Sequence, residues 1–247
     1  MKRNKGKKRI DTLLVELRMV ESRARAQSLI MAGAVTSGGK IVDKAGTMVP
    51  EDARVEIASP PPFIGRGGIK LEHALESFGL DVKGKVALDI GASTGGFTDC
   101  LLKRGARLVY AVDVGYGQID YRLRNDPRVV VMERVNARYP FSLPEKADLA
   151  TFDLSFISVE KVIPQVVNLL VDRGILVVLL KPQFEARRNE VGRGGVIRQP
   201  EIQARVIGRF ISWVVENRFR LLGMAASPIP GASGNREFFF MLVRRTR

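Results

Sequence analysis

Apolar runs and amphipathic stretches alternate along the chain from Lys85 onward. Runs such as KVALDIG and GILVVLLKP are typical of buried strands, and GGFTDCLLKRG and PEIQARVIGRFISWVVEN have the spacing of helices. Strands that alternate with helices predict an α/β fold with a doubly wound, parallel sheet. The last two runs, FRLLGMAASP and EFFFMLVRR, have no helix between them, so we expect them to pair antiparallel at one edge. Pro164 predicts that the helical stretch VEKVIPQVVNLLV is kinked there or begins there.

The N-terminal part of the chain follows another pattern. Residues 1–9 carry six positive charges and no acid, which predicts a flexible basic arm. A helix with Asp11 as its expected N-cap follows, and a second helix should begin near Ser22 and end at Gly33. The segment VTSGGKIV predicts a tight hairpin with Gly38–Gly39 in its turn. Two helices and a hairpin indicate a small α+β unit.

Prolines and glycines separate these two patterns. The sequence ASPPPFIGRGG at residues 58–68 predicts a linker. We therefore expect a small N-terminal domain at residues 1–58, a linker at residues 59–68 and an α/β domain at residues 69–247.

The charge balance points to a polyanionic partner. The 247 residues include 40 Lys and Arg against 26 Asp and Glu, which gives a formal net charge of +14. This balance favours nucleic acid, with an acidic membrane surface second and solubility alone as the remaining alternative. A single cysteine, Cys100, and a single histidine, His73, exclude an internal disulfide and metal sites that need several such ligands, so we expect no metal. The chain fits a reducing cytoplasm, and without a signal-like segment or a long apolar run we expect no membrane span.

The segment LDIGASTGGFTDCLL combines a strand end, a glycine-rich turn and the start of a helix. Small residues let the backbone approach a ligand, and a helix N-terminus favours negative charge. The glycines do not have the GxGxxG spacing of dinucleotide sites. An acid at the strand end followed by G-x-S-x-G-G indicates a loop for S-adenosylmethionine, with an ordinary strand-to-helix turn as the alternative. The residues expected at this loop are Asp89, Gly91, Ser93, Gly95, Gly96 and Phe97.

Polar residues also follow the later strands. Asp113 ends the second strand, where nucleoside-binding sheets hold a ribose diol, although a surface carboxylate is the alternative. Asn136 follows the third strand, where it could contact an adenine edge or simply form a turn. Asp153 ends the fourth strand and Lys181 the fifth. Because ligands bind beyond the carboxyl ends of such strands, we expect these residues to surround one site.

Two lysines and two carboxylates are candidates for the reacting centre. Lys181 leaves a strongly apolar strand, Glu237 begins the last strand, and Lys70 lies near the start of a helix. Each could instead be an ordinary surface charge. Together with Asp153 they suit methyl transfer to a ribose hydroxyl, because a lysine can orient the hydroxyl while carboxylates hold the lysine. The motif for amino-group methylation, N/D-P-P-Y/F, is replaced by FDLSF, and one cysteine is too few for C5-methylation of a pyrimidine.

These motifs together resemble the TlyA family of rRNA 2′-O-methyltransferases, which is related to FtsJ/RrmJ-type enzymes. The resemblance is carried by DIGASTGGFTD, DVGYGQ, ERVNAR, DLSFIS, LLKPQFEA and GNREF. The segment KRIDTLLVELRMVESRARAQSLIMAGAVTSGGKIV resembles the small RNA-binding module of ribosomal protein S-four. The resemblance implies a Rossmann-like class I methyltransferase sheet, mostly parallel with an antiparallel last strand, after a small α+β RNA-binding domain.

The resemblance also assigns a catalytic tetrad. It implies that Lys70, Asp153, Lys181 and Glu237 act together, with Lys181 at the centre. The family pattern YVSRGG reads FIGRGG here, and Gly65 in place of serine bears on the linker and not on the tetrad.

The resemblance implies S-adenosylmethionine as the cofactor, held around Gly91, Ser93, Gly95, Asp113 and Asn136, with Asp153 shared between cofactor and reacting centre. It implies a cytidine 2′-hydroxyl of ribosomal RNA as the target, in one or both ribosomal subunits. Nothing in the sequence indicates an oligomer, so we expect a monomer.

Basic residues are candidates for RNA contacts, although each alone could be a solvated charge. Those expected are Arg23, Arg25, Lys40, Lys44 and Arg66. The segment ARRNEVGRGGVIR at residues 186–198 predicts a mobile basic lid over a target nucleotide turned out of its stack. The alternatives are a ribosome-binding factor without catalysis, a small-molecule methyltransferase and a membrane-acting hemolysin. The complete tetrad, the RNA-binding module and the lack of a membrane segment argue against them in turn.

Overall fold

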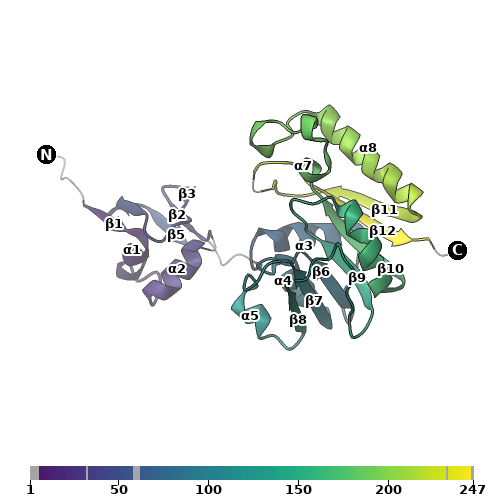
Figure 1. Cartoon of the computed structure of the whole chain (residues 1–247). Coiled ribbons are helices and arrows are strands. Elements are labelled where there is room, and N and C mark those ends of the chain that lie inside the picture. The colour runs from purple at the N-terminus through teal and green to yellow at the C-terminus, as the bar shows by residue number, and fades with distance from the viewer. Residues whose placement is uncertain (1–5, 32, 58–61, 232, 246–247) are drawn as a thin grey trace. The chain divides into compact units, whose positions relative to one another are not determined.

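The computed structural model describes residues 6–31, 33–57, 62–231 and 233–245 of the chain. The chain divides into two compact units, Met1–Gly65 and Arg66–Arg247. Figure 1 shows the small unit in purple and the large unit in colours from blue to yellow.

The small unit has its own apolar core, which includes the buried side chains of Ile10, Leu14 and Ile30. Its elements are β1 (Lys7–Arg9), α1 (Ile10–Glu16), α2 (Arg23–Met31), β2 (Val35–Ser37), β3 (Lys40–Ile41), β4 (Met48–Pro50) and β5 (Val55–Ile57). Strand β1 pairs antiparallel with β4, and β2 lies between β3 and β5. The expected hairpin is confirmed, with Gly38 and Gly39 at φ values of 57° and 76° between β2 and β3.

The expectation that Asp11 caps the first helix is wrong. Arg9 occupies the N-cap position, and Asp11 lies inside α1 with a fully buried side chain. Its carboxylate accepts hydrogen bonds from the guanidinium groups of Arg9 and Arg23 and from the Gln27 amide. The Arg9 guanidinium contributes most to holding the pKa of Asp11 far below its usual range. A short acid before a helical pattern resembles a cap, but here it anchors two arginines.

The large unit is built on a seven-stranded sheet. Its strands are β6 (Val86–Ile90), β7 (Leu108–Asp113), β8 (Val129–Glu133), β9 (Ala147–Phe152), β10 (Leu170–Leu180), β11 (Phe219–Ala226) and β12 (Phe238–Arg244). They lie in the order β11-β12-β10-β9-β6-β7-β8, and all are parallel except β12, which runs antiparallel to both of its neighbours. This confirms the Rossmann-like, doubly wound sheet with an antiparallel last strand. The chain changes direction across the sheet between β6 and β9, where such folds bind ligands.

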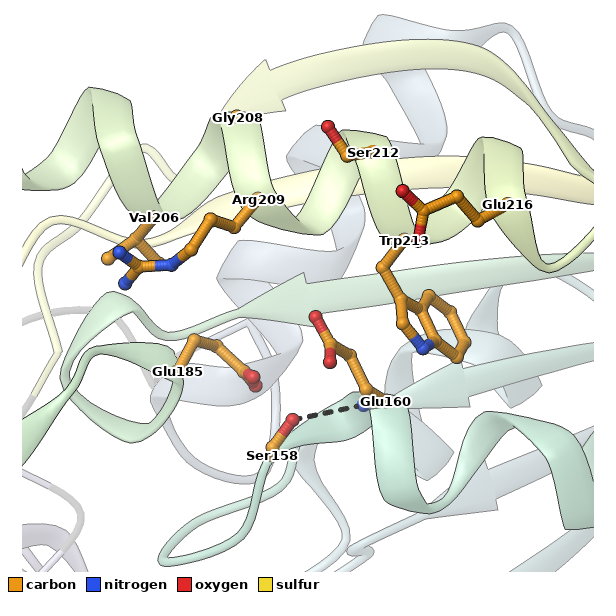
Figure 2. A pocket seen from close by; sticks show the side chains of 9 residues that line it. All are labelled: Ser158, Glu160, Glu185, Val206, Gly208, Arg209, Ser212, Trp213 and Glu216. Carbon is orange, nitrogen blue, oxygen red and sulfur yellow. Dashed lines mark hydrogen bonds between the residues drawn. The ribbon is translucent and has the colours of Figure 1, made fainter.

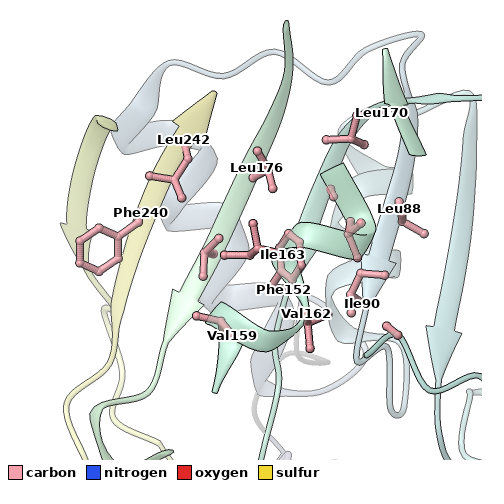
Figure 3. Packing of buried hydrophobic residues seen from close by; sticks show 14 of the residues in the cluster. Leu88, Ile90, Phe152, Val159, Val162, Ile163, Leu170, Leu176, Phe240 and Leu242 are labelled. Atoms are coloured by element: carbon pink, nitrogen blue, oxygen red, sulfur yellow. The ribbon is translucent and has the colours of Figure 1, made fainter. Parts of the chain in front are cut away.

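Helices and short 3-10 turns cover the sheet. The helices are α3 (Arg66–Phe78), α4 (Gly96–Lys103), α5 (Tyr121–Arg124), α6 (Ile163–Val166), α7 (Pro182–Glu185) and α8 (Pro200–Glu216). The 3-10 turns are η1 (Val159–Lys161), η2 (Val167–Leu169), η3 (Arg188–Glu190) and η4 (Arg193–Gly195). Figure 3 shows the core on one face, where Leu88, Phe152 and Leu176 of the strands lie near Ile163 of α6. Pro164 lies in the first turn of α6, so this helix begins at the proline rather than bending there.

The large unit begins before the end of the expected linker. Residues 66–68 belong to α3, because that helix starts at Arg66. The pattern Gly67–Gly68 suggests flexibility, but a Cβ on Gly67 would lie only 3.3 Å from the ring of Phe97. Gly67 therefore serves a close contact between helices. Residues 1–5 of the basic arm, residue 58 and residues 59–61 of the expected linker lie outside the described residues. Residues 7–9 of the arm, expected to be flexible, instead form strand β1. Among the helices that the structure describes, none is long and apolar enough to cross a bilayer.

Candidate active site

The turn between β6 and α4 brings the backbone against the end of β9. Gly91 has a φ of 85°, and a Cβ there would lie 2.6 Å from the carbonyl oxygen of Asp153. Gly95 has a φ of 96°, and a Cβ on it would clash with the side chain of Leu123. Both positions therefore need glycine, for the positive φ and for the space.

A pocket of about 190 Å³ opens at this turn. Its lining residues are Gly67, Gly91, Ala92, Ser93, Thr94, Gly96, Phe97 and Asp153. Small residues form most of the lining, and the ring of Phe97 stacks on Phe239 with centroids 6.1 Å apart. Because Gly96 is the first residue of α4, the pocket lies at the N-terminus of that helix, which suits a negatively charged group.

Asp89 supports the turn from the interior. Its buried carboxylate accepts hydrogen bonds from the Thr98 hydroxyl at 2.7 Å and the Thr151 hydroxyl at 3.1 Å. Burial raises the pKa of Asp89 to about 7. Asp89 ties β6 to α4 and β9, because both of its oxygens accept from hydroxyls within the protein. Its predicted contact with the cofactor stays a prediction.

Asp113 lies at the carboxyl end of β7 and is held by backbone groups. One carboxylate oxygen accepts from the amide of Ser93 at 2.8 Å, and the other accepts from the amide of Gly115 at 2.7 Å. The carbonyl of Asp113 also accepts from the amide of Val135, which places the exposed Asn136 just beyond the neighbouring strand end. The carboxylate is therefore fixed beside the glycine-rich turn, with lone pairs left over for ligand hydroxyls.

The four tetrad residues form two ion pairs. The Nζ of Lys181 lies 2.6 Å from Oδ1 of Asp153, and the Nζ of Lys70 lies 2.6 Å from Oε2 of Glu237. The second pair is the more enclosed, with 9% of the Lys70 side chain and 2% of the Glu237 side chain exposed. Helix α3 contacts both pairs, because a Cβ on Gly67 would lie 3.8 Å from Oδ2 of Asp153 and Lys70 follows three residues later. The structure thus brings the four side chains to the same edge of the sheet.

The loop before β12 encloses Glu237. A Cβ on Gly231 would clash with the Glu237 carboxylate, so the loop can pack on that group only with glycine there. Arg66 donates a hydrogen bond from Nη2 to the carbonyl oxygen of Pro230 at 2.6 Å. Arg66, expected to contact RNA, thus has an intramolecular contact that holds this loop.

Two residues beside Lys181 escaped the sequence reasoning. The Oγ of Ser155 accepts a hydrogen bond from the Nζ of Lys181 at 3.0 Å. Phe156 is 92% exposed, has a positive φ of 65°, and its ring lies 5.1 Å from that of Phe184. An exposed phenylalanine in a disfavoured backbone conformation needs a functional reason. The FDLSF motif contained both residues, but only the fold shows that Ser155 contacts the lysine and that Phe156 packs on Phe184.

The remaining RNA candidates are exposed on the small unit. Arg25, Lys40 and Lys44 are exposed, and Arg23 is more than half exposed although Asp11 holds it at 3.0 Å. They are therefore accessible to a polyanion.

The segment at residues 186–198 is more firmly held than the expected mobile lid. The carboxylate of Glu190 pairs with Arg209 at 2.7 Å and with Arg205 at 3.4 Å, both on α8. Two arginines of the long helix α8 therefore fix one part of this segment. The glycines and charges of the segment alone do not predict these contacts.

Figure 2 shows a second pocket, of about 590 Å³, beneath α8. Glu160 and Glu185 point into it, and burial raises the pKa of both carboxyl groups. Glu185 also accepts from the amide of Val159, and Arg209 and Trp213 complete the wall. Two carboxylates make this pocket unsuited to a polyanion, and none of the expected site residues lines it.

Comparison with known proteins places this geometry among methyltransferases. The model of the FtsJ-like methyltransferase family matches residues 63–244, and that of the S4 domain matches residues 8–55. The 16S/23S rRNA (cytidine-2′-O)-methyltransferase TlyA of Mycobacterium tuberculosis is 43% identical over 96% of this chain and 90% of its own length. Hemolysin A of Brachyspira hyodysenteriae is 42% identical over 93% of this chain and 97% of its own length.

Solved structures agree with these matches. The structure of a proposed hemolysin from Streptococcus thermophilus has a TM-score of 0.76 at 39% identity and covers 97% of this chain and 89% of its own. A structure of an S-adenosylmethionine-dependent methyltransferase from Mesorhizobium loti, at 16% identity and a TM-score of 0.53, shares the fold over 70% of this chain and 96% of its own.

Proposed function

The chain belongs to the FtsJ-like methyltransferase family, and from this we propose that it methylates the 2′-hydroxyl of a ribosomal RNA cytidine with S-adenosylmethionine as donor. One observation carries the proposal. Asp153 lines the glycine-rich pocket and is also 2.6 Å from Lys181, so a donor site and a basic reacting group share one side chain.

The residues at the pocket fit S-adenosylmethionine. Gly91 and Gly95 let the turn pack against Asp153 and Leu123, where a Cβ would clash, and the start of α4 favours a carboxylate such as that of the donor's amino-acid part. Asp113 is positioned to accept from ribose hydroxyls, and Asn136 would border the base. When bound, S-adenosylmethionine supplies a methyl group on a positively charged sulfur. The acceptor oxygen forms a bond to this group with its own lone pair while the electrons of the methyl–sulfur bond stay on the sulfur.

Lys181 holds the acceptor hydroxyl in this scheme. A lysine ammonium has three N–H donors. One of them points to Ser155, and Asp153 lies against the ammonium as an ion pair, so the lysine keeps donor capacity for the acceptor oxygen. As the oxygen loses its proton, the Lys181 ammonium can take that proton at Nζ only by passing one of its own to Oδ1 of Asp153. The pair then gains one positive charge, which equals the charge that the donor's sulfur loses.

The Lys70–Glu237 pair supports the other side of the site. Because the pair is buried, separating the two side chains would leave an unpaired charge in the interior, which costs free energy, so the two stay paired. The Lys70 ammonium is thus a fixed positive charge suited to the RNA phosphate or ribose next to the target.

The RNA would be held in two places. The S4 domain presents Arg23, Arg25, Lys40 and Lys44 to the phosphate backbone. Phe156 directly follows Ser155, which accepts from Lys181, and presents an exposed ring on which a nucleobase turned out of its stack can stack.

Methyl transfer to separated ribosomal subunits tests the proposal. Unmodified small and large subunits receive labelled S-adenosylmethionine with the wild type, Lys181→Ala or Lys103→Ala. Lys103 pairs with Asp99 at 2.8 Å on α4 and is the matched control for loss of a lysine–aspartate pair. We expect alkali-resistant label at one nucleotide with the wild type and Lys103→Ala, and none with Lys181→Ala. No label on either subunit or on whole ribosomes, with the cofactor bound, would refute the proposal and favour a ribosome-binding factor without catalysis.

A further inference from the structure

Asn235 lies between two loops at the edge of the active site. Asn235 is buried, and only 2% of the residue is exposed. Nδ2 donates to the carbonyl oxygen of Gly195 at 2.9 Å, and Oδ1 accepts from the amide of Ile197 at 2.9 Å. The carbonyl oxygen of Asn235 itself accepts from the amide of Gly231, also at 2.9 Å.

These bonds connect the segment at residues 186–198 to the loop that encloses Glu237. Ile197 is 3% exposed, so the segment is buried at the point where Asn235 binds its backbone. Glu237 follows Asn235 by two residues, and Gly231 packs against its carboxylate. One buried amide therefore joins a basic surface segment to a member of the tetrad.

We propose that Asn235 is a positioning residue that fixes Glu237, and through it Lys70, relative to the segment at residues 186–198. The inference rests on the proposed function and adds a residue that assembles its site. The asparagine amide suits the task because it offers one donor and one acceptor side at once, as the carbonyl of Gly195 and the amide of Ile197 require.

Loss of the side-chain hydrogen bonds of Asn235 should reduce the rate of methyl transfer more than the affinity for the ribosomal subunit or for S-adenosylmethionine. Without the amide, the buried N–H of Ile197 and the carbonyl of the exposed Gly195 both lose their partner, and the loops can separate. A displacement of about 1 Å in a reacting group costs on the order of 100-fold in rate. We expect Asn235→Ala to lower kcat by about 10- to 100-fold, with little change in KM for the ribosomal subunit or in the Kd of S-adenosylmethionine.

Gln203 provides a matched control. Its Nε2 donates to the carbonyl oxygen of Ile197 at 2.9 Å, so it anchors the same segment from α8 without reaching the Glu237 loop. Gln203→Ala should loosen the segment, which trypsin cleavage at its arginines would measure, but should leave kcat near the wild-type value. Asn235→Asp keeps the shape and the acceptor for Ile197, but it turns an acceptor oxygen toward the carbonyl of Gly195 and adds a charge at a buried site, so its kcat should also fall.

The experiment measures kcat, KM, cofactor Kd and trypsin cleavage for the wild type and these three variants at full length. A selective loss of kcat in both Asn235 variants supports the inference. An equal loss in Gln203→Ala would overturn it, because order in the segment alone would then suffice. Unchanged kcat in Asn235→Asp, or in a folded Asn235→Ala, would overturn it too. If the wild type itself transfers no methyl group, the proposed function fails and the inference falls with it.

Discussion

The Lys70–Glu237 pair should allow stability and catalysis to be separated. Only 9% and 2% of these two side chains are exposed. Lys70→Met or Glu237→Leu alone leaves one charge buried without its partner, which costs about 3–5 kcal/mol. That is a large share of the roughly 5–15 kcal/mol that stabilises a domain. Lys70→Met/Glu237→Leu removes both charges and fills the space with apolar groups, so its stability should return to about the wild-type value or exceed it. All three variants should lose methyl transfer.

Urea unfolding of the large unit, followed by circular dichroism, gives the change in midpoint at constant m-value. Arg107→Met is the control, because the Arg107–Glu145 pair is solvent-exposed at 56% and 43% and is screened by water. Its midpoint should hardly change. If the double variant is as unstable as the single variants, the electrostatic argument is refuted. If the double variant still transfers methyl groups, the Lys70–Glu237 pair does not belong to the reacting centre.

Three further predictions concern the pocket and its surroundings. The pKa of Asp89 is raised from 3.8 to about 7 in the folded state, so the folded protein keeps a proton that the unfolded chain has lost. The free energy of unfolding should thus fall as pH rises from about 4 to about 7. Urea midpoints measured at several pH values should show a smaller fall for Asp89→Asn, and an equal fall in both proteins would contradict the raised pKa of Asp89. Gly91→Ala should abolish S-adenosylmethionine binding in equilibrium dialysis, whereas Gly208→Ala, whose Cβ would meet nothing within 4 Å, should bind normally. Phe156→Ala should raise KM for the ribosomal subunit on the order of tenfold without changing cofactor binding, and an unchanged KM would exclude stacking on this ring.

Periodicity and motif spacing predict the sheet well because they depend on local sequence. All five residues of β6 are buried, and the run VALDI, apolar apart from Asp89, already indicates that burial. The glycines after it are predicted for the same reason, since positive φ and close approach leave few alternatives to glycine. The tetrad residues could be named individually, but their pairing as Lys70 with Glu237 and Lys181 with Asp153 depends on strand order.

Other features depend on tertiary contacts that no local pattern encodes. Asp11 resembles a cap because its arginine partners include one twelve residues away, on the next helix. The hydrogen bond from Thr151, on a neighbouring strand, to the second oxygen of Asp89 also depends on strand order. The two side-chain hydrogen bonds of Asn235 join it to residues about forty positions earlier in the chain, so the sequence around Asn235 does not predict them.

Asp153 explains why the donor pocket and the reacting centre must be built together. Its carbonyl lies so close to the turn after β6 that only glycine is tolerated at Gly91, and its carboxylate holds Lys181. Helix α3 then brings Gly67 against the same residue and Lys70 to Glu237. A shift of the end of β9 would therefore disturb the pocket and the lysine at once. For the proposed function, we infer that the close packing at these two glycines, more than any single charge, sets the distance between a bound donor and the acceptor.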